Sequence, residues 1–476
     1  MVDEVVVGKA ELKSVPAKTE YRKQAYRYTS NWVKKVAVLC GLFLSAFGSS
    51  SAFAALTVSP IFRSDMVLQQ GMAVPVFGAA DPGATVTVQF RNQSGSAVAD
   101  SDGRWQVNLA SMSASAFPST MTVTSGSASV SFTSVQVGEV WVYSGQSNMG
   151  LPLSNANGGS AAIADSPNHN IRLFRMTGGA GPGSSSWQVA SATTTPGFSA
   201  VAWWMGLELS QTLNVPVGLI QATHDGTSIS EWTHSNGGTG DDYDAMVKAI
   251  QPFAVRGIAW YQGESDGGDN TYDIKLTGMI DEWRGDWDLP GLPFGIVQLT
   301  WRPSGYVPCR EAQLRVATST PNTFLVVTTD IPVSNALHPR EKKPVGIRLG
   351  VGARGAVYGE NIEYSGPIRD DTASFVSGNT VVINFTHLGN GLFTGDSLAP
   401  GPFKIAGSNG RFQTANAMIV GNSVHVWSSS VSAPKTVRYQ WDYGVGNLYN
   451  LVSIPTEGGA VLVERLPAPQ FELKFP

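Results

Sequence analysis

Charged residues are scarce in this chain of 476 residues. Only 14% of the residues are Asp, Glu, Lys or Arg, whereas 52 Gly and 27 Pro residues interrupt the 42% that are apolar. So many turn-forming residues exclude a disordered chain and a helical bundle, and they favour a strand-rich globular protein. The length suffices for two or three domains, each with a core of its own.

Cysteine is equally scarce, and this excludes a disulfide framework. Cys40 lies in an apolar segment near the N-terminus, so Cys309 is the only cysteine in the rest of the chain. A single thiol forms neither an internal disulfide nor a zinc site. The six histidines lack a metal-binding spacing such as H-E-x-x-H, and D-G-G-D-N at 266–270 has too few spaced oxygens for a calcium loop. We therefore expect neither a metal nor another cofactor.

A leader is predicted over residues 1–54. Basic residues ending at Lys34 and Lys35 precede the apolar run V-A-V-L-C-G-L-F-L-S-A-F-G, and A-F-A at 52–54 provides a cleavage site of small residues. The apolar run is shorter than the roughly 20 residues needed to span a bilayer, so a retained membrane anchor is the weaker alternative. Cleavage after Ala54 would release a secreted or periplasmic protein that is not attached to a membrane.

The chain after the leader is acidic. The leader holds 8 Lys and Arg and 4 Asp and Glu, which leaves 24 basic and 32 acidic residues in the remainder. An acidic exported protein without basic runs is not expected to bind nucleic acid.

Three regions are predicted after the leader. Residues 55–137 consist of short alternating segments with D-P-G and S-D-G turns, which is typical of antiparallel β structure. Residues 138–355 alternate apolar strands with helical periods, which indicates an α/β domain whose parallel sheet is covered on both faces. Residues 356–476 return to short strands and turns. The predicted strands span 140–143, 215–222, 257–261, 294–299 and 323–328, and the predicted helices span 200–213 and 343–353.

Ser147 follows the apolar segment V-W-V-Y-S-G at the carboxyl end of a predicted strand, where open parallel sheets bind their ligands. Its hydroxyl could attack a substrate while N–H groups at a helix start hold an oxyanion. Alternatively, Ser147 and Asn148 only cap a helix. Met149 replaces the last glycine of G-x-S-x-G, so the usual α/β-hydrolase elbow is not supported. His338, in the loop after strand 323–328, is the candidate base.

Three segments together resemble a known family. G-Q-S-N-M (145–149), W-Y-Q-G-E-S (260–265) and H-P-R-E-K-K-P-V-G-I-R-L (338–349) are similar to successive signature blocks of the sialate O-acetylesterase group of SGNH hydrolases. The similarity extends from P-I-F-R-S-D-M-V-L-Q-Q near the start to V-R-Y-Q-W near the end. The resemblance implies an SGNH-like three-layer α/β domain with a central parallel sheet, flanked by N- and C-terminal β-rich regions. It also implies a serine esterase that acts on acetylated sugars or polysaccharides.

The same resemblance implies roles for individual residues. Ser147 would be the nucleophile and His338 its base. The backbone N–H groups of Ser147 and Gly226 and the side-chain amide of Gln262 would hold the oxyanion, and loss of one such donor typically costs about 10²–10³ in rate. Each residue also has a plainer interpretation: Gly226 as a turn glycine, and Gln262 as a buried amide that ties loops together.

The sequence departs from the family pattern at two places. Ala336 stands where family members commonly have the Asp of N-D-I-H-P, and loss of the acid of such a triad can cost roughly 10⁴ in rate. Asp330 at the end of the preceding strand is a candidate to orient His338, and Asn335 or a backbone carbonyl are alternatives. The second departure is T-H-D-G-T at 223–227, where the family usually has W-G-G-T, so the pocket wall is expected to differ.

Two functions remain open at this point. The first is an exported carbohydrate O-acetylesterase that works through an acetyl-enzyme, and the alternative is a catalytically degenerate carbohydrate-binding protein on the same fold. Glu264 is expected to fix the loop that carries Gln262, because the sequence offers no second carboxylate for a glycosidase. Sialic acid, xylan, xyloglucan and pectin all remain open as the acetylated substrate.

Overall fold

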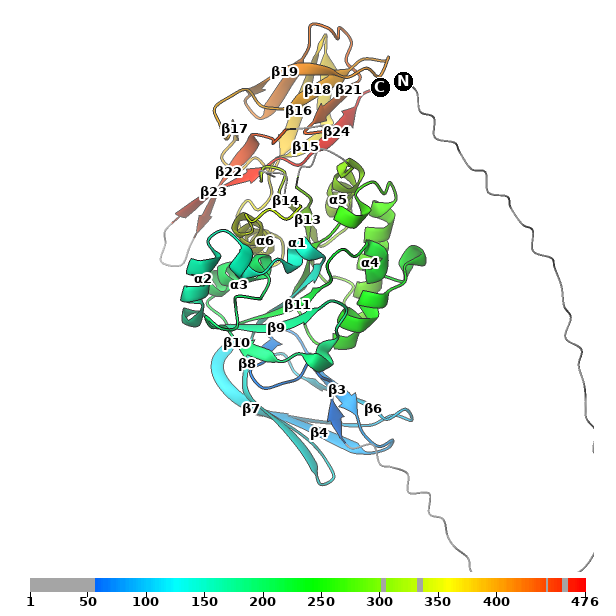
Figure 1. The fold of residues 1–476 in the computed structure, drawn as a ribbon, viewed down its shortest axis with the longest axis vertical. Coiled ribbons are helices and arrows are strands. Elements are labelled where there is room, and N and C mark those ends of the chain that lie inside the picture. The colour runs from blue at the N-terminus through cyan, green and yellow to red at the C-terminus, as the bar shows by residue number, and fades with distance from the viewer. Residues whose placement is uncertain (1–55, 301–304, 332–336, 442–443, 456–460) are drawn as a thin grey trace, which may run out of the picture. The chain divides into compact units, whose positions relative to one another are not determined.

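The computed structural model describes residues 56–300, 305–331, 337–441, 444–455 and 461–476 (Figure 1). These residues belong to one compact unit, Ala52–Pro476. The predicted leader with its cleavage site after Ala54 lies outside the described residues, as do Asn335 and Ala336. Within the described ranges, no helix combines the length and the apolar character needed to cross a membrane.

A mixed sheet of eleven strands contains the predicted parallel strands. Its parallel part has the order β9-β11-β8-β12-β13-β14, and β10 pairs antiparallel with β9 at the edge. The five predicted strands are confirmed, each within two residues at its ends except at β8, which extends farther in both directions. The bounds are β8 (Ala128–Gly145), β9 (Ile171–Thr177), β10 (Trp187–Val189), β11 (Val217–Thr223), β12 (Gly257–Tyr261), β13 (Phe294–Gln298) and β14 (Thr323–Val327).

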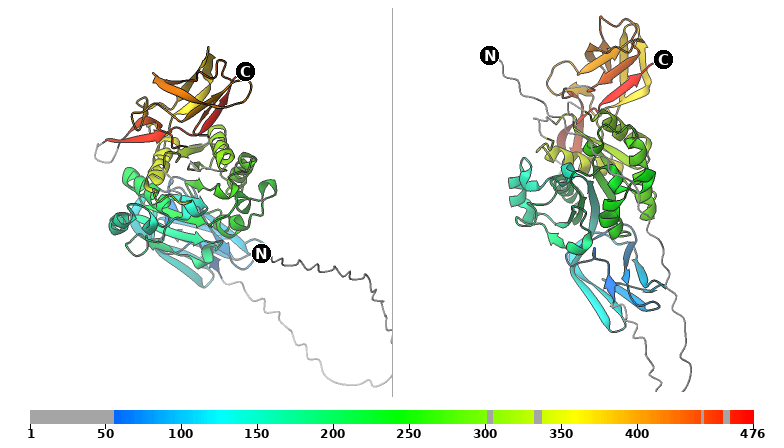
Figure 2. Two further views of the ribbon diagram at one scale, coloured as in Figure 1. Left: turned by 45° about the horizontal axis from the view of Figure 1, so that its top comes forward. Right: turned by 45° about the vertical axis from the view of Figure 1, so that its right-hand side comes forward.

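Helices cover both faces of the parallel strands (Figure 1 and Figure 2). On one face α3 (Ala200–Leu213) packs against α6 (Lys343–Ala356), and on the other α4 (Tyr272–Asp286) packs against α5 (Val307–Ser319). The short helices α1 (Ser147–Gly150) and α2 (Gly159–Asp165) follow β8. The two predicted helices are α3 and α6, whereas α4 and α5 were not predicted.

Strand β8 is 18 residues long and crosses from the N-terminal region into the parallel strands. Its first part pairs antiparallel with β7 (Ser115–Ser125), and its last residues lie between β11 and β12. The boundary expected after residue 137 therefore falls inside one continuous strand. The other strands of this region are β1 (Thr57–Val58), β2 (Val67–Gln69), β3 (Val74–Ala79), β4 (Thr85–Phe90), β5 (Gln93–Val98) and β6 (Arg104–Leu109).

The C-terminal region is rich in strands. A seven-stranded antiparallel sheet has the order β15-β16-β20-β19-β18-β21-β24, and a three-stranded sheet has the order β17-β22-β23. The bounds are β15 (Ile368–Ser377), β16 (Thr380–Thr386), β17 (Leu392–Thr394), β18 (Phe403–Ala406), β19 (Gln413–Val420), β20 (Ser423–Trp427), β21 (Thr436–Tyr439), β22 (Leu448–Pro455), β23 (Val461–Pro467) and β24 (Phe471–Lys474).

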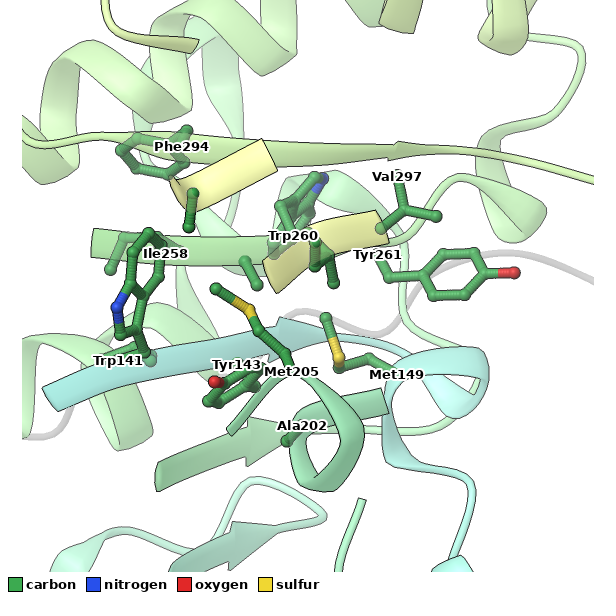
Figure 3. Packing of buried hydrophobic residues seen from close by; sticks show 14 of the residues in the cluster. Trp141, Tyr143, Met149, Ala202, Met205, Ile258, Trp260, Tyr261, Phe294 and Val297 are labelled. Carbon is green, nitrogen blue, oxygen red and sulfur yellow. The ribbon is translucent and has the colours of Figure 1, made fainter. Parts of the chain in front are cut away.

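Large side chains fill the core next to the parallel strands. Every residue of β11, β12 and β13 is buried, as expected for parallel strands covered on both faces. Met149 of α1 and Met205 of α3 lie among these side chains (Figure 3). Full burial of one such apolar side chain stabilises the fold by about 1.5–3 kcal/mol, so the strand ends that carry the site are firmly held. Trp203 and Trp204 of α3 are also buried in the core.

Candidate active site

Ser147 is the first residue of α1 and is presented by a tight turn at the end of β8. Gly145 has a φ of 127°, and a Cβ at this position would lie 2.2 Å from the backbone oxygen of Tyr261 on β12. The two strand ends can approach this closely only because residue 145 is glycine. The N–H of Gln146 donates to the same Tyr261 oxygen at 3.2 Å, so the turn is tied to the neighbouring strand.

His338 lies beside Ser147, although 191 positions separate them in the chain. The distance from His338 Nε2 to Ser147 Oγ is 2.7 Å, which is the length of a good hydrogen bond. When Nε2 carries no proton, it accepts the hydroxyl hydrogen. This is the geometry that a base needs to activate a serine nucleophile, so the two residues that the sequence paired are brought together.

Two backbone N–H groups at this edge of the sheet have no acceptor among the described residues. One belongs to Ser147, which is at a helix start and has no intrahelical acceptor. The other belongs to Gly226, which follows β11, the strand next to β8. Gly226 has a φ of 78°, and no atom lies within 4 Å of a Cβ built there. Both donors therefore remain available for a ligand.

Gln262 does not present a free amide. Its side chain is completely buried, and Nε2 donates to Asp266 Oδ2 at 2.6 Å and to the Thr227 backbone oxygen at 3.0 Å. The hydroxyl of Tyr272 donates to Gln262 Oε1 at 2.8 Å. Gln146 Oε1 at 3.2 Å is a third protein acceptor for the two amide hydrogens, so this geometry does not support the expected role of Gln262 as an oxyanion donor. The amide instead ties the loop after β12 to the loop that contains Gly226.

Asp266 completes this connection between loops. Besides the Gln262 amide, its Oδ2 accepts the backbone N–H of Ile229 at 2.9 Å. Burial raises the pKa of the Asp266 carboxyl, although both donors favour the ionised form. The hydroxyl of Ser265 also donates to the Gly226 backbone oxygen at 3.0 Å. The 226–229 segment is therefore fixed by side chains that come from the loop after β12.

Asp330 is not in position to orient His338, which corrects the expectation from the sequence. Its two carboxylate oxygens accept from the guanidinium of Arg348 at 2.8 and 2.7 Å. Asp330 also lies near Tyr449 of β22. Burial of the Tyr449 hydroxyl and, next, the negative charge of Asp330 raise the pKa of Tyr449 to about 12. Asp330 and His338, both among the described residues, share no hydrogen bond. The carboxylate therefore joins the start of the base loop to α6 and to β22.

A polar cluster next to Ser147 was missed in the sequence. Asn148 Nδ2 donates to a carboxylate oxygen of Glu264 and, at 3.1 Å, to the backbone oxygen of Leu337. Asn148 Oδ1 accepts from Lys342 Nζ at 2.6 Å. The Lys342 ammonium also lies 5.1 Å from the centre of the Tyr261 ring. These contacts are consistent with the expectation that Glu264 fixes the loop after β12, and the Asn148 amide is a partner of the Glu264 carboxylate.

The Lys342 side chain is buried, and its ammonium group donates to the Asn148 amide oxygen. Burial lowers the pKa of Lys342 to about 7, and the charge of Glu264 opposes this decrease. Lys342 stands next to Lys343 in the sequence and just before α6, where a lysine is ordinarily solvated. No local pattern distinguishes it from its neighbour.

His224 and Asp242 form a second histidine–carboxylate contact. His224 Nδ1 lies 2.9 Å from Asp242 Oδ1, and burial raises the pKa of the Asp242 carboxyl. One ligand atom from each of His224, Glu231 and Asp242 lies within 4.8 Å of the others, so this group could hold a metal ion. Glu231, however, already accepts the Ser228 N–H at 3.2 Å in a helix cap. Each of these three side chains therefore has a protein partner in the structure.

Comparisons with known proteins relate this chain to carbohydrate esterases. Residues 137–350 match the family described as "Carbohydrate esterase, sialic acid-specific acetylesterase". Human sialate O-acetylesterase is 28% identical over 386 residues, which cover 64% of this chain and 72% of the human protein. The mouse sialate O-acetylesterase is 25% identical over 432 residues, covering 69% and 78% of the two chains.

A solved structure extends the likeness to the fold. The crystal structure of a carbohydrate acetylesterase from Xanthomonas citri has a TM-score of 0.79 and 29% sequence identity to this chain. The match covers 88% of this chain and 100% of the other. The chain is thus an esterase, and its residues 137–350 match the family model of the sialic acid-specific acetylesterases.

Proposed function

We propose that this protein is an exported carbohydrate O-acetylesterase that hydrolyses acetyl esters on sugars through an acetyl-enzyme. The observation that carries the proposal is the 2.7 Å contact between Ser147 Oγ and His338 Nε2 at the carboxyl edge of the parallel strands. The substrate class is supported by the names of the relatives, which are sialate O-acetylesterases and a carbohydrate acetylesterase.

The proposed reaction has two stages. Ser147 Oγ attacks the acetyl carbonyl carbon while its proton passes to His338 Nε2. The tetrahedral intermediate then breaks the bond to the sugar oxygen, and the imidazolium gives its proton to that oxygen. In the second stage His338 removes a proton from water, which attacks the acetyl-enzyme. Acetate leaves, and the proton returns to Ser147.

We propose that the free N–H groups of Ser147 and Gly226 hold the negative oxygen of the tetrahedral intermediate. Preorganised donors of this kind stabilise a developing charge without a metal. The contacts of Gln262 support an indirect role for this residue, since its amide binds the Thr227 backbone next to Gly226. Gln262 would thereby hold the Gly226 donor in place.

We also propose a domain layout and an exported location for this protein. Residues 138–355 would form an SGNH-type domain of three layers, with residues 55–137 and 356–476 as flanking regions that brace it. The basic and apolar pattern of residues 1–54 supports export, with cleavage after Ala54.

Acetate release tests the proposed function. The wild-type protein and Ser147→Ala are assayed with 4-nitrophenyl acetate and with acetylated sialic acid, xylan, xyloglucan and pectin. We expect the substitution to lower kcat by roughly 10⁴-fold or more, because the nucleophile is lost. Equal rates for the two proteins would exclude the esterase mechanism.

The alternative function is a carbohydrate-binding protein on the same fold. Ala336, which replaces the family's usual acid, is the observation that favours it. In that case the protein would bind acetylated glycans, but the release of acetate would not depend on Ser147. Calorimetric titration with the same glycans, beside the rate assay, separates the two functions.

A further inference from the structure

We infer that Asn148 and Lys342 are positioning residues that hold the nucleophile turn against the loop of the base. The inference rests on the proposed function, because it assigns these residues to the alignment of Ser147 with His338. The polar atoms of the two side chains bind Leu337, Glu264 and each other, so both residues would act on the reacting pair through other groups.

Asn148 is the link between the two reacting residues. It follows Ser147 directly in α1, and its Nδ2 donates at 3.1 Å to the backbone oxygen of Leu337, which directly precedes His338. The amide is 1% exposed, so water does not compete strongly for these contacts. A displaced Asn148 amide would release the backbone of the residue before the base. The 2.7 Å distance between Ser147 and His338 therefore depends on this contact.

Lys342 fixes the direction of the Asn148 amide. Its ammonium group has only hydrogens to donate, and Nζ lies 2.6 Å from Asn148 Oδ1. The oxygen end of the amide must therefore face Lys342, which turns the two Nδ2 hydrogens toward Leu337 and Glu264. With the opposite orientation, the amide nitrogen would meet the ammonium and its oxygen would meet the Leu337 carbonyl.

Charge complementarity explains why the cluster tolerates burial. Glu264 accepts from Asn148, and Lys342 donates to it, so the amide bridges a negative and a positive side chain. The three loops involved follow β8, β12 and β14, and Lys342 stands at the start of α6. Burial of a lone lysine is costly, and apolar replacements of buried charges are often neutral or stabilising. We therefore attribute the buried Lys342 ammonium to its role in orienting the Asn148 amide beside Ser147.

The decisive variants are Lys342→Met and Asn148→Ser. Lys342→Met removes the ammonium and retains a long buried side chain, and Asn148→Ser removes the link to Leu337 without a larger side chain. The matched control is Arg354→Met, which removes a buried positive charge from the other end of α6. Arg354 pairs there with Glu208 and Glu360, each at 2.8 Å.

We expect both site variants to lower kcat for 4-nitrophenyl acetate by about 10²-fold, because displacement of a reacting group by about 1 Å has an effect of this size. KM should change by less than about threefold, because both side chains are proposed to act through protein groups and not by binding the substrate. Arg354→Met should leave kcat of the folded protein within about threefold of wild type. If Lys342→Met does not fold, as judged by circular dichroism, Asn148→Ser provides the same test.

Crystal structures of the variants give a readout that does not require activity. We expect the separation of Ser147 Oγ and His338 Nε2 to exceed hydrogen-bond length in Lys342→Met and in Asn148→Ser. Wild-type kcat together with an unchanged separation would overturn the inference and leave the proposed function intact. If instead the wild-type protein shows no Ser147-dependent hydrolysis, the proposed function fails, and the crystallographic separation alone decides whether the two residues position Ser147 and His338.

Discussion

Replacing Asp330 with asparagine is expected to destabilise the folded protein by about 3 kcal/mol and to leave kcat nearly unchanged. The carboxylate and the Arg348 guanidinium form two hydrogen bonds at 2.8 and 2.7 Å, and the two side chains are only 11% and 10% exposed. Removal of one partner from a buried pair typically costs about 3–5 kcal/mol. Asparagine keeps the shape and one acceptor oxygen, which favours the lower end of this range.

The kinetic expectation separates two roles for Asp330. An acid that orients a catalytic histidine contributes roughly 10⁴ in kcat, as seen when such an acid is replaced by its amide. Because Asp330 binds Arg348 and has no hydrogen bond to His338, we expect Asp330→Asn to keep kcat within about threefold of wild type. The loss of stability should instead appear as a lower urea midpoint.

The assay combines urea unfolding with steady-state hydrolysis of 4-nitrophenyl acetate below the unfolding transition. Arg348→Met is the matched variant, because it removes the other member of the same pair. A double variant should lose less stability than the sum of the single variants, since the unpaired charge is then absent. The reasoning would be refuted if Asp330→Asn kept its stability but hydrolysed the ester at least about 10³-fold more slowly, a threshold of about one tenth of the full acid effect.

Three further expectations follow. Gly226→Ala should lower kcat by about 10²–10³-fold, because a φ of 78° strains alanine and redirects the N–H; Gly83→Ala, at a φ of 81° with open space around it, is the control that should retain kcat. Gly145→Ala should abolish Ser147-dependent acetate release, since its Cβ would lie 2.2 Å from the Tyr261 oxygen, and normal turnover would contradict the close approach. Burial lowers the pKa of Lys342 from 10.5 to about 7, so the folded state binds fewer protons than the unfolded state between these values. Urea unfolding should therefore show wild-type stability rising with pH across this window relative to Lys342→Met.

Much of the central fold is predictable because it depends on local patterns. G-I-A-W-Y and F-G-I-V-Q-L are apolar runs of strand length, and they form β12 and β13. Ser147 and His338 are recognisable because they stand after such strands. Helix α4 had a usable signal that was overlooked, since its buried residues Leu276, Met279, Ile280 and Trp283 recur at helical spacing.

Side-chain partners are less predictable because they come from distant parts of the chain. Asp330 is near the base in sequence, yet Arg348 on α6 supplies two donors that satisfy both its oxygens. Gln262 fits a family position, but only the packed loops show that Asp266 and the Thr227 backbone use its amide hydrogens. In the sequence Lys342 resembles a solvated lysine, and only the packing of loops from distant parts of the chain buries it.

Because β8 is continuous, the N-terminal region cannot be exchanged for another domain without changing the strand that leads to Ser147. The strand begins at Ala128, pairs with β7, and ends at Gly145, two residues before Ser147. Glu139 of β8 connects the two regions, because its carboxylate accepts hydrogen bonds from Arg256 at 2.9 Å and from Gln70 at 2.8 Å. A graft at residue 137 would replace half of the strand that ends at the nucleophile turn. Substitutions in the N-terminal region and in the parallel strands consequently have to remain compatible with each other, both in evolution and in engineering.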